Sequence, residues 1–212
     1  MRKKQKVWLS IFLSSILIAS GIIFVIIFKF SCTNQKISTY FNQLFGWQET
    51  NGYVSSLTTF GNDLYIGTET SNHKGKLFKF DGTTVTLVNN WQEANGYVSS
   101  LTTFGKELYI GTKTDDEAGK FFKFDGTALT LVNNWPEANG IVYGLTTFDN
   151  NLYIGTKKGK FFKFDGVVLT PVNNWQATNG WINRLYIFGN DLYIGTITGE
   201  HKGKLLKATQ LT

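Results

Sequence analysis

The sequence repeats one motif four times. Each copy begins at a tryptophan and runs through an NG pair, an apolar segment and the string LYIGT, and the first three copies continue through GK to FDG. The copies start roughly 40 to 44 residues apart, at Trp47, Trp91, Trp135 and Trp175. A repeat of this length cannot bury its apolar face alone, so successive repeats stack on one another. We therefore predict a repeat architecture from Trp47 onwards.

Four short segments within each copy have the composition of β-strands. In the first copy they are VSSLTTF, LYIGT, KLFKF and TLVNN, and turn residues separate them. The DG pairs at Asp81, Asp125 and Asp165 favour a tight hairpin between the third and fourth segments. No segment shows the 3.6-residue period of a helix. Each copy therefore predicts a four-stranded antiparallel sheet, and radially arranged sheets of this size are the blades of a β-propeller. The predicted fold class is all-β, a four-bladed β-propeller.

The order NG, V, L, LYIGT, GK and KFDG, which covers residues 47–207, resembles the propeller repeats of sensory two-component regulators. The resemblance implies a propeller that acts as a ligand sensor, a protein sensor or a scaffold. LYIGT has a tyrosine where that pattern usually has a tryptophan, and no kinase or regulator sequence follows the repeats. We therefore do not expect a complete signalling receptor.

The fourth copy stops after its third strand segment. Residues 38–46 (STYFNQLFG) stand before Trp47 in the place that VNN occupies before the other tryptophans. We expect this N-terminal segment to complete the last blade as its fourth strand, which removes two exposed sheet edges; a flexible stalk is the alternative. The ring would close either as a four-bladed monomer or as a ring-sharing homodimer with eight blades, and the closing strand favours the monomer.

An apolar segment without charged residues occupies positions 7–28. A helix over this segment would be about 33 Å long, enough to cross the hydrocarbon core of a membrane. Basic residues precede it, so the positive-inside rule predicts a cytoplasmic N-terminus. We predict a single-pass cell-membrane protein with a cytoplasmic basic tail (1–6), a transmembrane signal anchor (7–28), a juxtamembrane linker (29–37) and an extracytoplasmic propeller (38–212). A lipoprotein anchored at Cys32 is the alternative.

The net charge of +6 is concentrated near the predicted anchor. Residues 1–31 hold five of the 21 basic side chains and no acidic one, so the other 16 basic residues nearly balance the 15 acidic ones. The charge therefore does not indicate nucleic-acid binding. The single cysteine precedes the predicted propeller, so we expect no disulfide within it.

The repeated tryptophans are the first group of candidate ligand-binding residues. They lie in the connections between predicted blades, where a buried indole stabilises packing through its large apolar area. The alternative is a lectin-like role in which each blade stacks its tryptophan on a sugar. These residues are Trp47, Trp91, Trp135 and Trp175.

The second group follows the NG pair, at the start of the predicted innermost strand and near the mouth of the central channel. Here the copies differ, because this position holds Tyr53, Tyr97, Ile141 and Trp181 in turn. Arg184 follows Trp181 closely and is expected to make an ordinary contact at the rim; contact with an acidic or carbonyl group of a ligand is the alternative that makes it a candidate.

No arrangement typical of catalysis is present in the sequence. Asp115, Asp116 and Glu117 are adjacent acidic residues that could bind Ca²⁺, but three neighbouring carboxylates usually form a solvated loop tip, so we predict no metal and no cofactor. The sequence therefore predicts a non-enzymatic module that binds a protein or cell-surface partner. A lectin-like propeller with a glycan ligand is the alternative.

Overall fold

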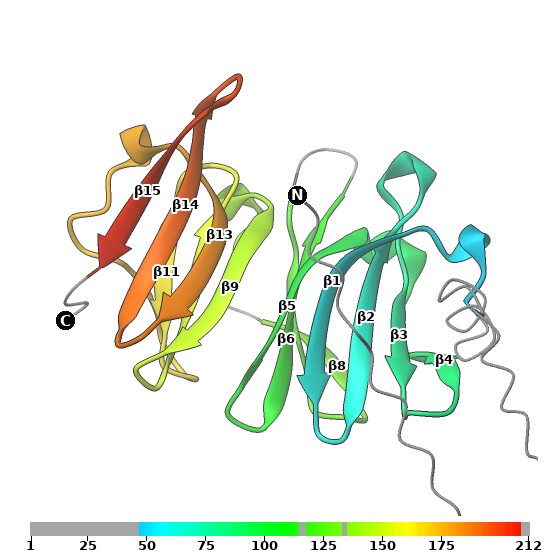
Figure 1. Cartoon of the computed structure of the whole chain (residues 1–212). Coiled ribbons are helices and arrows are strands. Elements are labelled where there is room, and N and C mark those ends of the chain that lie inside the picture. The colour runs from blue at the N-terminus through cyan, green and yellow to red at the C-terminus, as the bar shows by residue number, and fades with distance from the viewer. Residues whose placement is uncertain (1–46, 115–117, 133–134, 209–212) are drawn as a thin grey trace, which may run out of the picture. The chain divides into compact units, whose positions relative to one another are not determined.

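The computed structural model describes residues 47–114, 118–132 and 135–208 (Figure 1). The chain divides into two units, Met1–Lys36 and Ile37–Thr212, and all described residues belong to the second. The predicted tail, transmembrane anchor, linker and closing strand lie outside the described residues, as does the acidic cluster at 115–117. Within the described ranges, no helix is long and apolar enough to cross a membrane.

The described residues form four antiparallel sheets, numbered here in chain order. The first sheet contains β1 (Tyr53–Phe60), β2 (Asp63–Glu69), β3 (Leu77–Phe80) and β4 (Val85–Leu87). The second contains β5 (Tyr97–Phe104), β6 (Glu107–Lys113), β7 (Phe121–Phe124) and β8 (Leu129–Leu131). The third contains β9 (Val142–Phe148), β10 (Asn151–Thr156), β11 (Phe161–Phe164) and β12 (Leu169–Pro171), and the fourth contains β13 (Trp181–Phe188), β14 (Asp191–Gly199) and β15 (Lys202–Ala208). Short 3₁₀ helices lie in the connections: η1 (Glu49–Asn51), η2 (Ser71–His73), η3 (Glu93–Asn95), η4 (Glu137–Asn139) and η5 (Ala177–Asn179).

Strand order within each sheet follows the chain, so each copy of the sequence motif is one sheet. The first strands of consecutive sheets pack side by side, β1 on β5, β5 on β9 and β9 on β13 (Figure 1). This arrangement of repeated sheets is propeller-like and confirms the all-β prediction. The fourth sheet has three strands among the described residues, whereas the other three sheets have four.

The predicted DG hairpins are present and have a common local cause. In each, the aspartate carboxylate accepts hydrogen bonds from the backbone N–H groups two and three residues later, at 2.7–2.8 Å. These bonds lower the pKa of Asp81, Asp125 and Asp165. The following glycine takes the positive φ that the turn requires, for example 101° at Gly126.

The glycine of LYIGT lets neighbouring sheets approach closely. A Cβ on Gly67 would lie 2.6 Å from Cβ of Val98 in the next sheet. The same distance separates a Cβ on Gly111 from Cβ of Val142, and a Cβ on Gly155 from Cβ of Ile182. Real Cβ atoms do not come this close, so a branched side chain fills the space above each glycine. One contact therefore recurs at all three junctions between sheets.

Aromatic residues fill the rest of these junctions. The LYIGT tyrosines of the first three sheets, Tyr65, Tyr109 and Tyr153, are buried, each in a separate apolar cluster formed with the following sheet. The tryptophan after each of these sheets also points inward. Trp91 and Trp135 are buried, and the indole N–H groups of Trp91, Trp135 and Trp175 donate to the carbonyl oxygens of Gly75, Gly119 and Gly159 at 2.9, 3.1 and 2.8 Å.

The two end sheets do not bury each other in the way that neighbouring sheets do. Val54 is 48% exposed, whereas its equivalents Val98, Val142 and Ile182 are 0% exposed. The predicted closure of four blades within one chain is thus not formed by the described residues. Its predicted closing strand, 38–46, lies outside them.

Candidate functional site

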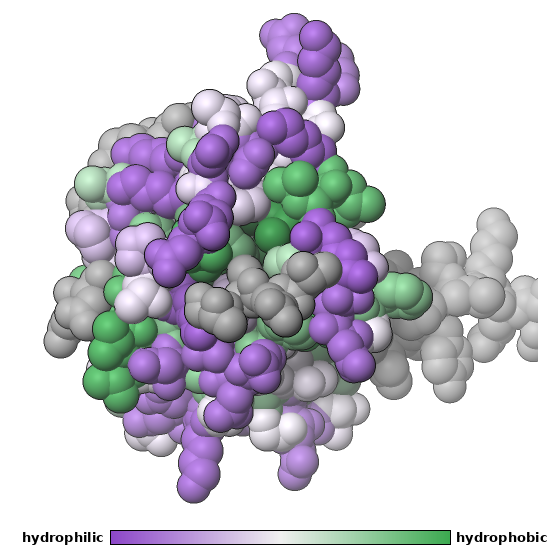
Figure 2. Space-filling view, turned by 90° about the vertical axis from the view of Figure 1, so that its left-hand side faces the viewer, coloured by the Kyte–Doolittle hydropathy of each residue, from purple (hydrophilic) through white to green (hydrophobic). Residues whose placement is uncertain are grey.

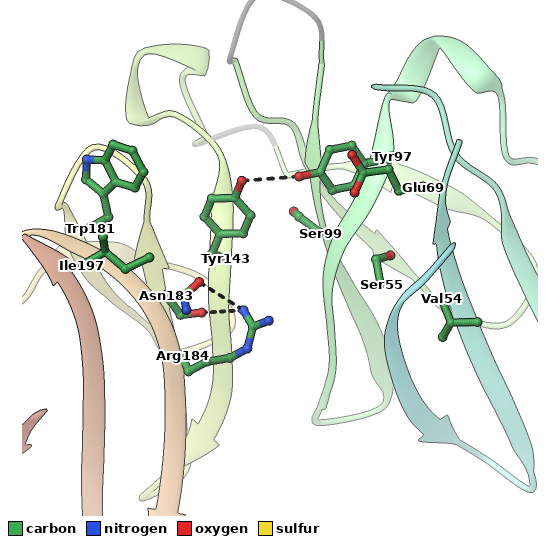
Figure 3. A pocket seen from close by; sticks show the side chains of 10 residues that line it. All are labelled: Val54, Ser55, Glu69, Tyr97, Ser99, Tyr143, Trp181, Asn183, Arg184 and Ile197. Carbon is green, nitrogen blue, oxygen red and sulfur yellow. Dashed lines mark hydrogen bonds between the residues drawn. The ribbon is translucent and has the colours of Figure 1, made fainter. Parts of the chain in front are cut away.

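The first strands of the four sheets converge on a central hollow of about 410 Å³ (Figure 3). All four sheets contribute to its wall, mainly through residues near the start of the first strand and the end of the second. The lining residues are Val54, Ser55, Glu69, Tyr97, Ser99, Tyr143, Trp181, Asn183, Arg184 and Ile197.

A β-bulge at the same place in every sheet shapes this wall. The register of the first two strands skips one residue in each sheet, and the skipped residues are Ser55, Ser99, Tyr143 and Asn183. All four line the hollow. A bulge re-aims a side chain that regular pairing would direct to a sheet face. The bulges therefore give every sheet one side chain for the hollow.

The serines at the bulges bind the next sheet. Ser55 Oγ donates to the carbonyl oxygen of Val98, and Ser99 Oγ donates to that of Val142 at 2.6 Å. These hydroxyls therefore link neighbouring sheets, and their role in the first two sheets is structural.

Tyr143 departs from this pattern and reaches across the wall instead. Its hydroxyl lies 3.3 Å from the hydroxyl of Tyr97, and the two share a hydrogen bond (Figure 3). Burial, followed by this bond, raises the pKa of Tyr97 above its ordinary value. Tyr97 is therefore neutral at physiological pH, and the pair offers hydroxyl groups to a ligand.

Two charged side chains line the hollow, one from the first sheet and one from the fourth. Arg184 comes from β13, and its Nη1 donates to the backbone oxygen of Asn183 at 2.7 Å and to Oδ1 of Asn183 at 3.4 Å (Figure 3). The equivalent positions in the other sheets hold Ser56, Ser100 and Gly144, so the cation belongs to the fourth sheet alone. Glu69, at the end of β2, is the carboxylate among the lining residues.

Trp181 presents an indole ring at the rim of the hollow. It is 44% exposed, and Nζ of Lys157 lies 4.8 Å from the ring centroid, a separation typical of a cation–π contact. Trp181 also borders a second hollow, of about 630 Å³, on the side of the η5 connection.

The predicted candidates separate into two groups in the structure. Tyr97, Trp181 and Arg184 line the central hollow, whereas Tyr53 is exposed and is not among its lining residues. The four repeated tryptophans are absent from the lining as well. Trp91, Trp135 and Trp175 make the inward contacts described above, and the ring of Trp47 packs edge-on against Phe78 at 5.3 Å. Their surroundings support the packing interpretation.

The variable positions of the repeat identify part of the site. Tyr143 and Asn183 stand where the copies differ, yet the bulge that turns them into the hollow is not visible in the sequence. Nothing in the sequence indicates that Glu69 belongs to the site, because it ends a strand of ordinary composition. In the part of the chain that the structure describes, no group of three or more His, Cys, Asp or Glu residues could hold a metal ion.

Comparison with known proteins gives a fold and no family. No protein-family model matches the chain, and no curated protein matches it. The chain is similar to the computationally designed Ika4 protein, with a TM-score of 0.55 and 14% identity over 78% of this chain and 96% of that chain. It is also similar to the extracellular domain of the hybrid two-component system BT4673 from B. thetaiotaomicron (TM-score 0.53, 17% identity, 71% of this chain and 22% of that chain). The extracellular domain of BT3049 from the same organism is similar as well, with a TM-score of 0.52 and 18% identity over 69% of this chain and 22% of that chain. At these identities the likeness concerns the fold alone.

Proposed function

We propose that the chain is a non-catalytic binding module that holds a carboxylate-bearing polypeptide segment of a partner protein in the central hollow. One observation carries this proposal: the repeats agree where the sheets pack and differ where they face the hollow. The packing positions keep a glycine opposite a branched side chain, whereas the bulge positions change from serine to tyrosine to asparagine. Side chains that differ from sheet to sheet around one shared hollow suit an asymmetric ligand.

The side chains in the hollow suit such a segment. A guanidinium group has five N–H donors in a planar fork that matches a carboxylate, and only Nη1 of Arg184 is engaged by Asn183. The indole of Trp181 and the tyrosine pair offer apolar surface with polar edges, which is the composition enriched at protein interfaces. Glu69 opposes a ligand of uniform negative charge and favours one that also carries a donor.

The proposed setting is the outer side of a membrane. Residues 7–28 would anchor the chain with its N-terminus in the cytoplasm, and the partner would then be a cell-surface protein; acylation at Cys32 is the alternative anchor. A non-enzymatic role is favoured because the lining residues include one carboxylate and no histidine or cysteine, so the hollow offers no paired base and nucleophile.

Exchanging residues between repeats provides the test. The double variant Asn183→Ser/Arg184→Ser gives the fourth sheet the residues that the first two sheets already accommodate at these positions. Val167→Thr is the matched control, because it places in the third hairpin turn the threonine found at positions 83 and 127, away from the hollow. The full chain in dodecyl maltoside micelles would be applied to an array of synthetic acidic peptides, to their amidated counterparts and to a glycan array.

We expect the wild type and Val167→Thr to bind a subset of acidic peptides, and the double variant to bind them at least tenfold more weakly, as the loss of a charged hydrogen bond predicts. Equal binding by all three proteins would contradict the proposal. Binding to glycans that survives in the double variant and is lost in Trp175→Phe would instead support the lectin-like alternative.

A further inference from the structure

The contact that joins neighbouring sheets is made three times, and within residues 47–208 as described both halves of a fourth such contact lie unpaired at the ends of the row. Gly195 is the LYIGT glycine of the fourth sheet, and among the described residues a Cβ on it would meet only Arg184 of its own sheet, at 3.8 Å or more. Val54, the branched residue of the first sheet, is 48% exposed. Leu57 beside it is 55% exposed, whereas its equivalents Leu101 and Leu185 are buried. We call the face of the first sheet that carries Val54 the docking face. The face of the fourth sheet that carries Gly195 is the receiving face.

The receiving face of the fourth sheet also has the apolar residues that such a junction buries. Leu205 pairs with Gly195 across β14 and β15, so the two share a face. It is 75% exposed, whereas Leu77, the same residue in the first sheet, is 0% exposed in a cluster with Trp91. Phe188 is exposed too, while its equivalents Phe60 and Phe104 pack against Phe124 and Phe164 of the next sheet at 6.4 and 6.3 Å. Figure 2 shows the side on which β15 lies, where hydrophobic patches reach the surface between hydrophilic ones.

We propose that a second copy of this chain occupies these faces, so that two copies form one ring of eight sheets. Each seam would place Val54 of one copy over Gly195 of the other. The same junction applied three times leaves the two end sheets of the described residues apart, so a fourth junction at either end requires a further sheet beside it. Propellers use about four to eight blades, and eight is the one larger multiple of four in that range. A two-fold ring also closes both seams and leaves no end exposed.

Further contacts follow from the three junctions already made. At the seam, Asn183 would occupy the position of Ser55 and Ser99, whose hydroxyls donate to the carbonyl oxygen of a valine in the next sheet. The side-chain amide of Asn183 would then donate to the carbonyl oxygen of Val54 of the second copy. Trp47 of the second copy would cover Leu205, as Trp135 and Trp175 cover Phe121 and Phe161 at 5.4 and 5.2 Å. The axis of the ring would then carry two Arg184 side chains. This inference goes beyond the proposed function and does not depend on it.

Gly195→Ala tests the seam directly, with Gly199→Ala as the matched control. Both substitutions add one methyl group on β14, and neither meets a close obstacle among the residues that the structure describes. At a seam like the three internal ones, however, the new Cβ of Gly195→Ala would lie about 2.6 Å from Cβ of Val54 of the second copy, as it would at Gly155 against Ile182. The mass of the full chain would be measured in dodecyl maltoside by light scattering across a dilution series, and folding would be followed by circular dichroism.

We expect the wild type and Gly199→Ala to have about twice the chain mass of 23.9 kDa. Gly195→Ala should keep the wild-type β-sheet spectrum and dissociate at concentrations at least tenfold higher. The proposal is overturned if the wild type is monomeric, if masses grow beyond two copies, or if Gly195→Ala pairs as tightly as Gly199→Ala. The last result would locate any pairing outside the seam, including in residues 1–46.

Discussion

Leu77 and Leu205 provide a matched test of how burial stabilises this fold. They occupy the same place in the third strand of the first and fourth sheets, opposite the LYIGT glycine. Leu77 is 0% exposed and Leu205 is 75% exposed. Replacing a buried leucine by alanine costs about 2–5 kcal/mol through lost burial and the cavity left behind. An exposed leucine loses little, on the order of 0.5 kcal/mol or less.

These free energies convert into melting temperatures. A domain of this size shifts by about 2–4 °C for each kcal/mol, so a central loss of about 3 kcal/mol in Leu77→Ala predicts a decrease of about 6–12 °C. Leu205→Ala should change the melting temperature by less than about 2 °C. Both variants would be made in the Gly195→Ala background and studied below the concentration at which that background pairs, so that no second copy covers Leu205. Unfolding would be followed by circular dichroism of the full chain in dodecyl maltoside. Equal shifts for the two variants would refute the assignment of burial to the internal junctions.

Two further substitutions test the junctions and the turns. Gly155→Ala would place a Cβ 2.1 Å from Cγ2 of Ile182, and overpacking should lower the free energy of unfolding by about 1–3 kcal/mol in a urea titration; an unchanged value would mean that the junction is loosely packed. For Asp125, two backbone N–H groups lower the carboxyl pKa, so its stabilising effect is present above the pKa of the unfolded chain and is lost as pH falls through the lowered value. The stability difference between the wild type and Asp125→Asn should therefore shrink from about pH 6 to pH 2, and a difference independent of pH would count against this role of the carboxylate.

The parts of the fold that could be predicted are those with a local cause. Strand composition identified three strands of each sheet, since β-branched and aromatic runs end at turn residues. The DG hairpins followed from a carboxylate that reaches the next backbone N–H groups and a glycine that takes positive φ. The fourth strands, such as β8 (Leu129–Leu131), were also anticipated but are short.

The site could be predicted only in part, because bulges depend on how two strands pair. The run VSSLTTF reads as a regular strand, and nothing in it alone shows that Ser99 is skipped when β5 pairs with β6. Without the bulge, Tyr143 and Asn183 have no assigned direction. Tyr97, Trp181 and Arg184 could be named because they differ between repeats at the start of a strand, which is where the sheets converge.

Ring closure could not be predicted because it depends on the angle between neighbouring sheets. That angle follows from the side chains that meet at each junction, here a branched residue over a glycine with a tyrosine beside it. The sequence shows that each copy has these residues, including the end copies at Val54 and Gly195. It does not show how many such junctions complete a circle.

The near identity of the repeats has a consequence for both proposals. Because every sheet keeps one docking face and one receiving face, the ends of the row are complementary to each other whatever the number of sheets. Such an interface must close into a ring or extend without limit. Because the faces at Val54 and Leu205 expose apolar side chains to water, they favour association that covers them. Tyr143 and Arg184, which break the repeat, lie on the inner wall of the hollow, away from the contact between glycine and branched residue. Assembly and recognition therefore use largely different positions of the same strands, and Asn183 is the position that they share.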